Sequence, residues 1–319
     1  MKIRKTAVLI LITSAFLITT AAPLQAFSLQ KADFAVNYKN HRIPFKEFSL
    51  FVIPGETIEL TAAEEFQNSS YELLYDSGQL IKKGKYSFRW KAPEEVGLYE
   101  LELRRSSASN NCKINFKVFV LYPYQNEKGS FINNYRIGNY PSIPQKMRQY
   151  YQTPSGFVEI MPSILDVKVS PHFKLGQFIC SQKGDYPKYL VLKEDILIKL
   201  EYFLIEINQK GIKADTFNIM SGYRTPFYNS SLGNSEHSRH IFGDAVDIFI
   251  DQNQNGVMDD LNGDGRIDIR DADVLYSIFI SLENKEFYRP LIGGIAKYRA
   301  NGIRGPFIHL DSRGFKARW

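Results

Sequence analysis

The chain has 319 residues, of which 44% are hydrophobic and 23% are charged, and its formal net charge is +6. No run of Lys and Arg is longer than three residues and no basic helix is predicted, so we expect no nucleic-acid partner. The two cysteines, Cys112 and Cys180, are too few for a disulfide framework and lack metal-ligand spacing. Their surroundings favour two separate buried thiols, although an exported location would permit a bond between them.

The first 26 residues have the pattern of a signal peptide. A cationic start, an apolar stretch and a plausible cleavage site follow one another: Lys2, Arg4 and Lys5, then Ala7 to Ala22, then Leu24-Gln25-Ala26. The apolar stretch is short for a membrane span of about 20 residues, so an uncleaved anchor is the less favoured alternative. Cleavage would remove three cationic residues and lower the net charge from +6 to +3. We therefore predict export to the periplasm or the cell envelope.

Residues 27–122 are predicted to form an all-β sandwich of antiparallel strands. Trp90-Lys91-Ala92-Pro93 followed by Gly97-Leu98-Tyr99 resembles bacterial immunoglobulin-like modules. No catalytic cluster occurs here, so we expect a spacer, or a docking module for a partner in the envelope. Turn residues such as Pro54-Gly55 separate the predicted strands, which are Phe48 to Ile53, Thr57 to Thr61, Tyr71 to Tyr75, Tyr86 to Trp90, Leu98 to Leu103 and Lys113 to Leu121.

Residues 123–165 are rich in Pro, Tyr, Asn and Gly, show little periodicity and are predicted to connect two domains. Aromatic side chains are seldom left in solvent, so we expect this connection to lie over the second domain. The aromatic residues concerned are Tyr135, Tyr140, Tyr150 and Tyr151. His172, a lone histidine beyond the connection, is expected to cap or to lie at the surface rather than to bind metal.

Residues 166–319 are predicted to form an α+β domain with an antiparallel sheet, because no run of alternating strands and helices follows. The clearest helix is Tyr189 to Lys210, whose apolar residues fall on one face and whose charged residues occupy much of the other. Gly211 stands where a helix stop is expected. Thr216 to Met220 and Ala245 to Ile250 are predicted strands.

Three residues near these strands have the chemistry of a catalytic zinc site. His240 and Asp247 lie seven residues apart in SRHIFGDAVD, and His309 comes from a distant predicted strand. Two imidazoles and one carboxylate leave the fourth tetrahedral position of Zn²⁺ open, as catalytic zinc sites do. Arg224, directly after a predicted strand, is a planar cation suited to binding a substrate carboxylate with two hydrogen bonds.

The segments SGYRTP, SRHIFGDAVDI and GPFIHLD occur in the order typical of M15 zinc peptidases, and residues 169–319 resemble that family. The family includes D-alanyl-D-alanine carboxypeptidases and murein endopeptidases with the hedgehog/DD-peptidase fold. The resemblance implies that His240, Asp247 and His309 bind zinc and that Arg224 anchors a substrate carboxylate. It also implies that the substrates are peptidoglycan stem peptides. We expect three further residues to shape the pocket: Ser221, Tyr223 and Ser238.

The sequence leaves the general base open. Some M15 enzymes carry Glu or His two or three residues before the last ligand, where this chain has Phe307 and Pro306. On a strand, Phe307, His309 and Asp311 point to one face, so Asp311 could approach the reacting water or steady His309. His237, three residues before the first ligand, is the other candidate. A branch of the family ending in FVH-x-D is similar to this chain, which argues against simple inactivation.

Residues 251–271 form a second candidate metal site, of the type that binds Ca²⁺. One loop places oxygen ligands at the positions used by EF-hand loops, with glycine at the sixth position and Asp at the last, as in dockerin loops. Its predicted ligands are Asp260, Asn262, Asp264, the Arg266 carbonyl, Asp268 and Asp271. An overlapping loop repeats the pattern with Asp251, Asn253, Asn255 and Asp259, so the sequence leaves one or two ions open. We expect a structural role for calcium, and a helix over Ala272 to Leu282 beyond it.

Taken together, these motifs favour an exported zinc peptidase that hydrolyses D-amino-acid-containing stem peptides, as a carboxypeptidase or as an endopeptidase. The alternative is a catalytically inactive wall-binding or scaffold protein that keeps the metal-binding fold. The missing acid or base at positions 306 and 307 supports this alternative. The oligomeric state is not specified by the sequence.

Overall fold

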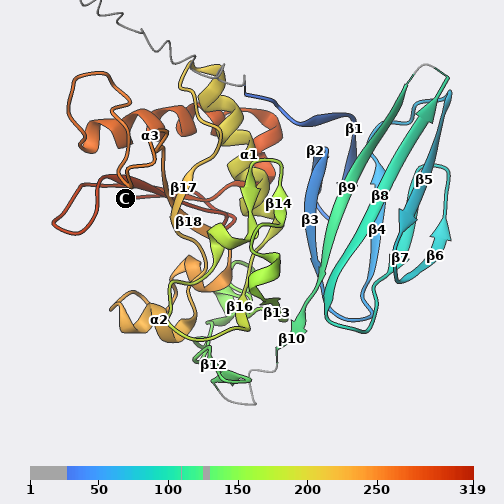
Figure 1. The fold of residues 1–319 in the computed structure, drawn as a ribbon, viewed down its shortest axis with the longest axis horizontal. Helices are drawn as coiled ribbons and strands as arrows, with labels where there is room; N and C mark the ends of the chain where they lie inside the picture. Colours follow the sequence, from blue (N-terminus) through green and yellow to red (C-terminus); the bar gives the residue numbers. More distant parts are fainter. Residues whose placement is uncertain (1–26, 109, 125–129) are drawn as a thin grey trace, which may run out of the picture.

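The computed structural model describes residues 27–108, 110–124 and 130–319, so the predicted signal peptide lies outside the described residues. Within these ranges, no helix is both long and apolar enough to cross a membrane. A β-sandwich occupies one side of the molecule and an α+β domain occupies the other (Figure 1).

The β-sandwich consists of a five-stranded and a four-stranded sheet, with alternate side chains buried between them. The strands of the first are, in spatial order, β2 (His41–Phe45), β1 (Lys31–Tyr38), β4 (Thr57–Ala62), β7 (Ser87–Lys91) and β6 (Gln79–Lys83). Those of the second are β3 (Glu47–Val52), β9 (Asn111–Val120), β8 (Gly97–Ser107) and β5 (Ser69–Tyr75). β3 pairs with β9 in parallel, so the prediction of a wholly antiparallel sandwich is wrong at this pair. The reason is that the chain passes from β2 in one sheet to β3 in the other, which aligns β3 with β9.

Several pairs of short β-strands link the sandwich to the central sheet of the α+β domain. Tyr140 and Tyr151 are buried against that domain, and the Tyr140 hydroxyl donates to the carbonyl of Ile241 at 2.9 Å. The strands of this region are β10 (Tyr122–Pro123), β11 (Phe131–Ile132), β12 (Tyr135–Arg136), β13 (Gly156–Ile160), β14 (Lys168–Ser170), β15 (Phe173–Lys174) and β16 (Lys188–Leu190). Single 3₁₀ turns lie at η2 (Gln145–Met147), η3 (Pro162–Ile164) and η4 (Leu175–Phe178).

The centre of the α+β domain is a five-stranded sheet with helices packed on one face (Figure 1). Its strands are, in spatial order, β17 (Asn218–Ser221), β18 (Ala245–Phe249), β20 (Phe307–Asp311), β19 (Gly294–Tyr298) and β21 (Ala317–Arg318). All pairs are antiparallel except β19 with β21. Helix α3 (Ile269–Glu283) packs on β19 and β20, and α1 (Glu194–Gln209) packs on α3. The remaining helical elements are α2 (Pro226–Ser231), η5 (Arg239–Phe242) and η6 (Glu286–Leu291).

Helix α1 begins five residues later than its sequence pattern predicts. Lys188–Leu190 pair with β13 instead, because these residues suit a strand as well as a helix and the partner strand decides between them. Glu194 and Asp195 then lie in the first turn, where carboxylates interact favourably with the helix dipole. The helix ends at Gln209, and Gly211, two residues beyond, has a φ of 90° that suits the predicted stop.

The charged face of α1 is largely buried. Glu194 accepts a hydrogen bond from the backbone N–H of Phe51 in the sandwich, 3.2 Å away. Glu201 accepts from His172, whose other ring nitrogen lies 2.9 Å from the carbonyl of Ser28. Because α1 is enclosed by the sandwich and the sheet, its carboxylates join the two halves of the molecule. His172 accordingly makes a structural contact away from the candidate metal site.

Cys112 and Cys180 are both free thiols, as predicted, but only Cys180 is buried. Cys112 is half-buried, and its sulfur accepts from the backbone N–H of Asp33 at 3.4 Å.

Candidate metal centre and active-site pocket

The central sheet brings two of the predicted ligands face to face. In the strand register, Asp247 on β18 lies opposite His309 on β20, and Ser221 on β17 lies opposite Asp247 on its other side. His240 comes from η5, which Gly243 ends with a φ of 72°. A Cβ atom at position 243 would lie 2.5 Å from the Val191 carbonyl oxygen, so this close turn requires glycine.

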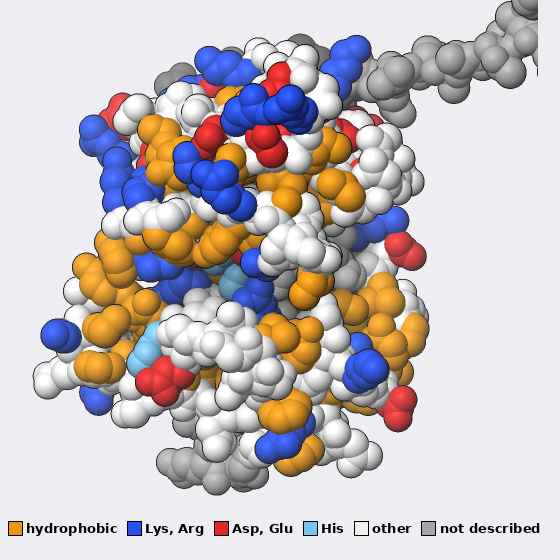
Figure 2. Space-filling view, turned by 90° about the vertical axis from the view of Figure 1, so that its left-hand side faces the viewer, with side chains coloured by type: hydrophobic (Ala, Val, Ile, Leu, Met, Phe, Trp, Pro, Cys, Tyr) orange, Lys and Arg blue, Asp and Glu red, His pale blue; other side chains and the backbone are white. Residues whose placement is uncertain are grey.

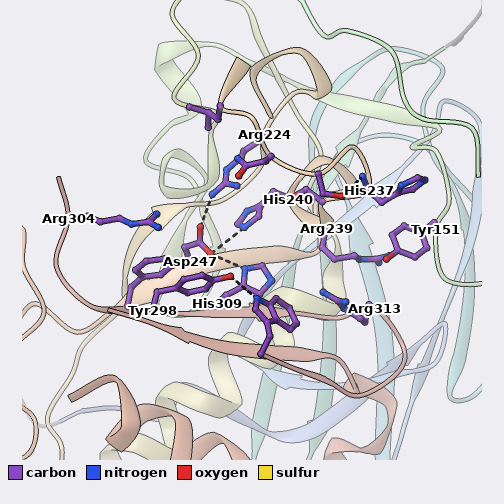
Figure 3. A pocket seen from close by; sticks show the side chains of 16 residues that line it. Tyr151, Arg224, His237, Arg239, His240, Asp247, Tyr298, Arg304, His309 and Arg313 are labelled. Carbon is purple, nitrogen blue, oxygen red and sulfur yellow. Dashed lines mark hydrogen bonds and ion pairs between the residues drawn. The ribbon is translucent and has the colours of Figure 1, made fainter. Parts of the chain in front are cut away.

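The three side chains converge on one point (Figure 3). His240 Nε2 lies 3.3 Å and His309 Nδ1 2.9 Å from the same Asp247 carboxylate oxygen. Ligand atoms of the three residues all lie within 4.8 Å of one another, and no other trio of His, Cys, Asp or Glu meets this condition in the described part of the chain. Two nitrogen donors and one oxygen donor at this spacing fit a zinc ion.

Each candidate ligand also contacts a further polar group. His240 Nδ1 donates to the Gly222 carbonyl at 2.7 Å, which turns the lone pair of Nε2 toward Asp247. His309 Nε2 lies 3.2 Å from Asp311 Oδ2, and Arg224 Nη2 donates to the outer oxygen of Asp247 at 2.7 Å. Such partners fix the tautomer and orientation of metal-binding histidines and raise their basicity.

The electrostatics of the cluster keep its carboxylates ionised. Burial would raise the pKa of Asp247, but His240 and His309 outweigh burial and hold it well below its usual range. Burial lowers the pKa of His240, and this effect exceeds the opposing effect of Asp247, so the imidazole favours its neutral, metal-binding form. Burial would also lower the pKa of His309, but hydrogen bonds to Asp247 and Asp311 raise it to about 9.

Asp311 is a positioning residue and does not face the pocket. Its side chain is fully buried, and it accepts from the Gly294 N–H at 2.8 Å and from Arg313 Nε at 2.9 Å as well as contacting His309. The prediction that it could approach the reacting water is therefore wrong. Its partners enclose the carboxylate, so it contacts His309 and is closed to a reacting water.

The cluster lies in a hollow of about 680 Å³ on one face of the molecule, where Figure 2 shows arginine and histidine side chains gathered. His237, the other candidate base, and Ser238 line it. The ring of His237 packs edge-on against Tyr151, and its Nε2 is buried without a hydrogen-bond partner among the described residues.

Several wall residues are not among the predicted pocket residues, because most of them come from separate segments without a common motif. Three arginines and four aromatic residues belong to this group: Arg239, Arg304, Arg313, Tyr151, Tyr298, Phe307 and Trp319. Runs of aromatic and basic residues near the chain end, such as those in residues 313–319, were the available signal.

Arg224 lies in the pocket as expected, whereas two predicted pocket residues near it, Ser221 and Tyr223, do not line it. Arg224 lines the pocket, but Nε donates to Ser221 Oγ at 2.8 Å while Nη2 binds Asp247, so much of its donor fork is already engaged. Ser221 thus positions Arg224 and is not itself part of the wall. Tyr223 is buried, with its hydroxyl 3.2 Å from that of Tyr140, and the prediction that it shapes the pocket is wrong. The turn after β17 directs its ring into the core, where it packs near Phe157.

The carboxylates of the predicted calcium segment accept hydrogen bonds from the backbone N–H groups of their own loops. Asp260, for example, accepts from the N–H of Gly265 at 2.7 Å. Arg270 forms an ion pair with Asp264 at 2.6 Å. Asp271 is fully buried and receives three backbone N–H bonds, so it acts as a capping residue for α3. The other predicted ligands are at least partly exposed: Asp251, Asn253, Asn255, Asp259, Asn262, Arg266 and Asp268.

Comparison with known proteins supports one family. The model of the peptidase M15 family matches residues 208–262, a segment that contains Arg224, His240 and Asp247 but not His309. The match supports a peptidase that acts on cell-wall peptides. No curated protein matches the chain.

Likenesses to solved structures are weak. Chimeric titin Z1Z2, functionalised with a peptide from decorin, is 12% identical over 27% of this chain and 93% of its own, with a TM-score of 0.20. Fibronectin(III)-like modules of CbhA from Clostridium thermocellum are 20% identical over 27% of this chain and 94% of their own, with a TM-score of 0.19. Likenesses of this size carry no argument about function.

Proposed function

We propose that the chain is a zinc peptidase of the M15 type, with a hedgehog/DD-peptidase α+β domain, that hydrolyses D-amino-acid-containing stem peptides of peptidoglycan. One observation carries the proposal: the buried convergence of His240, Asp247 and His309 at the floor of a pocket. The M15 match over residues 208–262 supports the substrate class. Export to the periplasm or cell envelope belongs to the same proposal and rests on the sequence of residues 1–26.

Zinc held by His240, Asp247 and His309 would supply Lewis acidity that polarises the scissile carbonyl and activates water. The chain's own residues prepare this site in three ways. Asp311 and the Gly222 carbonyl orient the two imidazoles. Arg224 holds the Asp247 carboxylate and places a positive charge beside the reacting carbonyl, where negative charge develops.

His237 is the proton-transfer group that we favour. It lies on the pocket wall three residues before His240, and its side chain is partly exposed. Asp311, the other candidate, is enclosed by Arg313, His309 and Gly294. A histidine on the wall, in contrast, can exchange protons with substrate and solvent.

We further propose that residues 251–271 bind one or two structural calcium ions. The support is the spacing of Asp, Asn and Gly in the two loops. β18, which carries Asp247, ends at Phe249, so this segment follows the metal-binding strand directly. The β-sandwich would serve as a spacer or as a docking module for an envelope partner.

The proposed activity is tested with defined muropeptides and the zinc-loaded protein. Mass spectrometry should detect a released D-amino acid from a carboxypeptidase, or a cut cross-link from an endopeptidase. The His240→Ala variant should release neither. A parent protein that binds zinc and wall peptides but leaves every muropeptide intact would instead support the inactive scaffold.

A further inference from the structure

Four arginines line the pocket, and three of them already bind carboxylates of the chain. Arg224 pairs with Asp247, Arg239 with Asp244 and Arg313 with Asp311. Arg304 differs from these three, because no carboxylate lies within ion-pair distance of it anywhere in the described ranges. Among the pocket's arginines it therefore keeps its full charge and donor set for a ligand.

Arg304 is nevertheless held in place. Asn301 closes a tight turn around it, because Asn301 Oδ1 accepts the Arg304 N–H at 3.1 Å and the Asn301 N–H donates to the Arg304 carbonyl at 2.9 Å. The guanidinium carbon lies 4.4 Å from the centroid of the Phe307 ring. Stacking on an aromatic face leaves the edge of a guanidinium free to donate hydrogen bonds in its own plane.

The ring beneath Arg304 belongs to a supported aromatic wall. Tyr298 and Phe307 stack with centroids 4.6 Å apart and planes 3° from parallel. Trp319 Nε1 donates to the Tyr298 hydroxyl at 2.7 Å, and the Trp319 ring lies 5.4 Å from that of His309. Arg304 and the metal ligand His309 are thus fixed to the same wall, and Figure 3 shows Arg304 reaching from its loop toward Asp247.

We propose that Arg304, rather than Arg224, binds a free carboxylate of the substrate peptide and makes the pocket selective for peptides that carry one. The inference rests on the proposed peptidase function and adds a specificity-determining residue to it. A planar guanidinium with unengaged N–H groups matches a carboxylate through two parallel hydrogen bonds. Arg224 cannot present the same fork, because it binds Ser221 and Asp247. The carboxylate is either the C-terminal one of the peptide or one on a side chain.

The test compares one defined stem peptide in three forms: unmodified, amidated at its C-terminus, and amidated at its side-chain carboxylate. The zinc-loaded parent, Arg304→Gln and Arg304→Lys are assayed on each. Removing the bound carboxylate should lower the parent's kcat/KM by roughly 10-fold or more, because its charge-assisted hydrogen bonds to Arg304 are lost. On the unmodified peptide, Arg304→Gln should show the same loss of kcat/KM. On the amide that lacks the bound carboxylate, the substitution should cause no further loss. The amide that abolishes the effect of Arg304→Gln identifies the carboxylate.

Arg299→Gln is the matched control. Arg299 is an exposed residue of the segment leading into the same loop and does not line the pocket, so the same charge change should alter kcat/KM by no more than about twofold. The ratio of kcat/KM on the unmodified peptide to kcat/KM on each amide is compared between Arg304→Gln and the parent. If the ratio is the same in both proteins for both amides, the inference is wrong. If the parent binds zinc but hydrolyses none of the peptides, the proposed peptidase function fails. In that case, the Kd values with which the parent and Arg304→Gln bind the same peptides test the role of Arg304 without hydrolysis.

Discussion

Asp247 and His309 face each other across β18 and β20, with His309 Nδ1 2.9 Å from Asp247 Oδ1. Their separation is set by the backbone ladder of a central sheet, which is more rigid than a loop. His240 alone comes from a turn, and the hydrogen bond to the Gly222 carbonyl restrains its ring. Two of the three ligands are therefore preorganised by the fold itself.

Zinc binding should depend strongly on Asp311, although this carboxylate would not touch the metal. Asp311→Asn removes the negative partner of His309 Nε2 and keeps an oxygen for the Gly294 N–H. We expect the zinc affinity to fall roughly 10- to 100-fold, as for other carboxylates behind metal-binding histidines. A competition titration with a chromophoric chelator measures the change, and circular dichroism checks the fold.

His309→Ala should lose its one equivalent of zinc altogether. Undiminished zinc in that variant would refute the ligand assignment.

Arg224→Lys should keep the positive charge and lose the geometry that bridges Ser221 and Asp247. We expect kcat/KM on a defined stem peptide to fall by roughly 10-fold or more, because Lys cannot make both hydrogen bonds at once. Steady-state kinetics at saturating zinc separates this effect from metal loss. Ser221→Ala, which removes one of the two acceptors, should cause a smaller decrease. Equal kcat/KM values for Arg224→Lys and the parent would exclude Arg224 from the working site.

His237→Gln tests the proton-transfer role. Gln preserves a polar side chain but exchanges no proton, so kcat should fall roughly 100-fold or more while KM and zinc content change little. Ser235→Ala is the control, because Ser235 lines the same wall without an acid–base group. A His237→Gln variant with the parent's kcat would mean that another group is the base.

Calcium, if bound by residues 251–271, should stabilise the α+β domain by mass action. A calcium-selective chelator should lower the melting temperature of this domain, and added Ca²⁺ should restore it, whereas Mg²⁺ should substitute poorly. Asp264→Ala should resemble the chelated parent. Asp273→Ala removes the same charge from the exposed surface of α3 and should keep the calcium response. Identical melting of the Asp264→Ala variant with and without calcium, together with an unresponsive parent, would show that the segment is merely acidic.

The contact between the sandwich and α1 should respond to pH through His41 and Asp195, whose side chains lie 2.5 Å apart. Burial would lower the pKa of His41, but Asp195 outweighs it and raises the pKa above its ordinary value near 6.5. Because the pKa of His41 is higher in the folded state, protonated His41 stabilises the fold, fully at pH values below its unfolded pKa of about 6.5. This stabilisation is lost as the pH rises through the folded pKa. Asp195 has a lowered pKa despite burial, so its contribution is lost only in acid.

His41→Asn should therefore lower the free energy of unfolding by about 1 kcal/mol near pH 5.5 and by less near pH 8. Urea denaturation at the two pH values measures the difference. In an Asp195→Asn background the His41→Asn substitution should lose its pH dependence, as expected for a coupled pair. A pH-independent effect in both backgrounds would mean that the ion pair does not contribute.

Sequence alone was sufficient for the features that depend on local chemistry and spacing. The six predicted strands of the sandwich coincide with strands of the structure within a few residues, because alternating apolar residues and turn residues mark them directly. The trio of His240, Asp247 and His309 was identified because zinc restricts its ligands to a few residue types, and the structure brings these three together. The M15 match covers the segment with the first two.

Tertiary structure alone decided which polar groups lie behind the ligands and which face the pocket. Asp311 and Tyr223 turn inward because their positions on β20 and after β17 place them against buried partners that lie far away in the sequence. Glu194, Lys199 and Glu201 look solvent-exposed on a helical pattern, yet they are buried because the sandwich and the sheet enclose α1. Arg304 and Trp319 meet at the pocket through loop and edge-strand packing, for which a one-dimensional pattern carries no signal. Periodicity reports which face of an element is apolar; only the packing of distant elements determines what covers the other face.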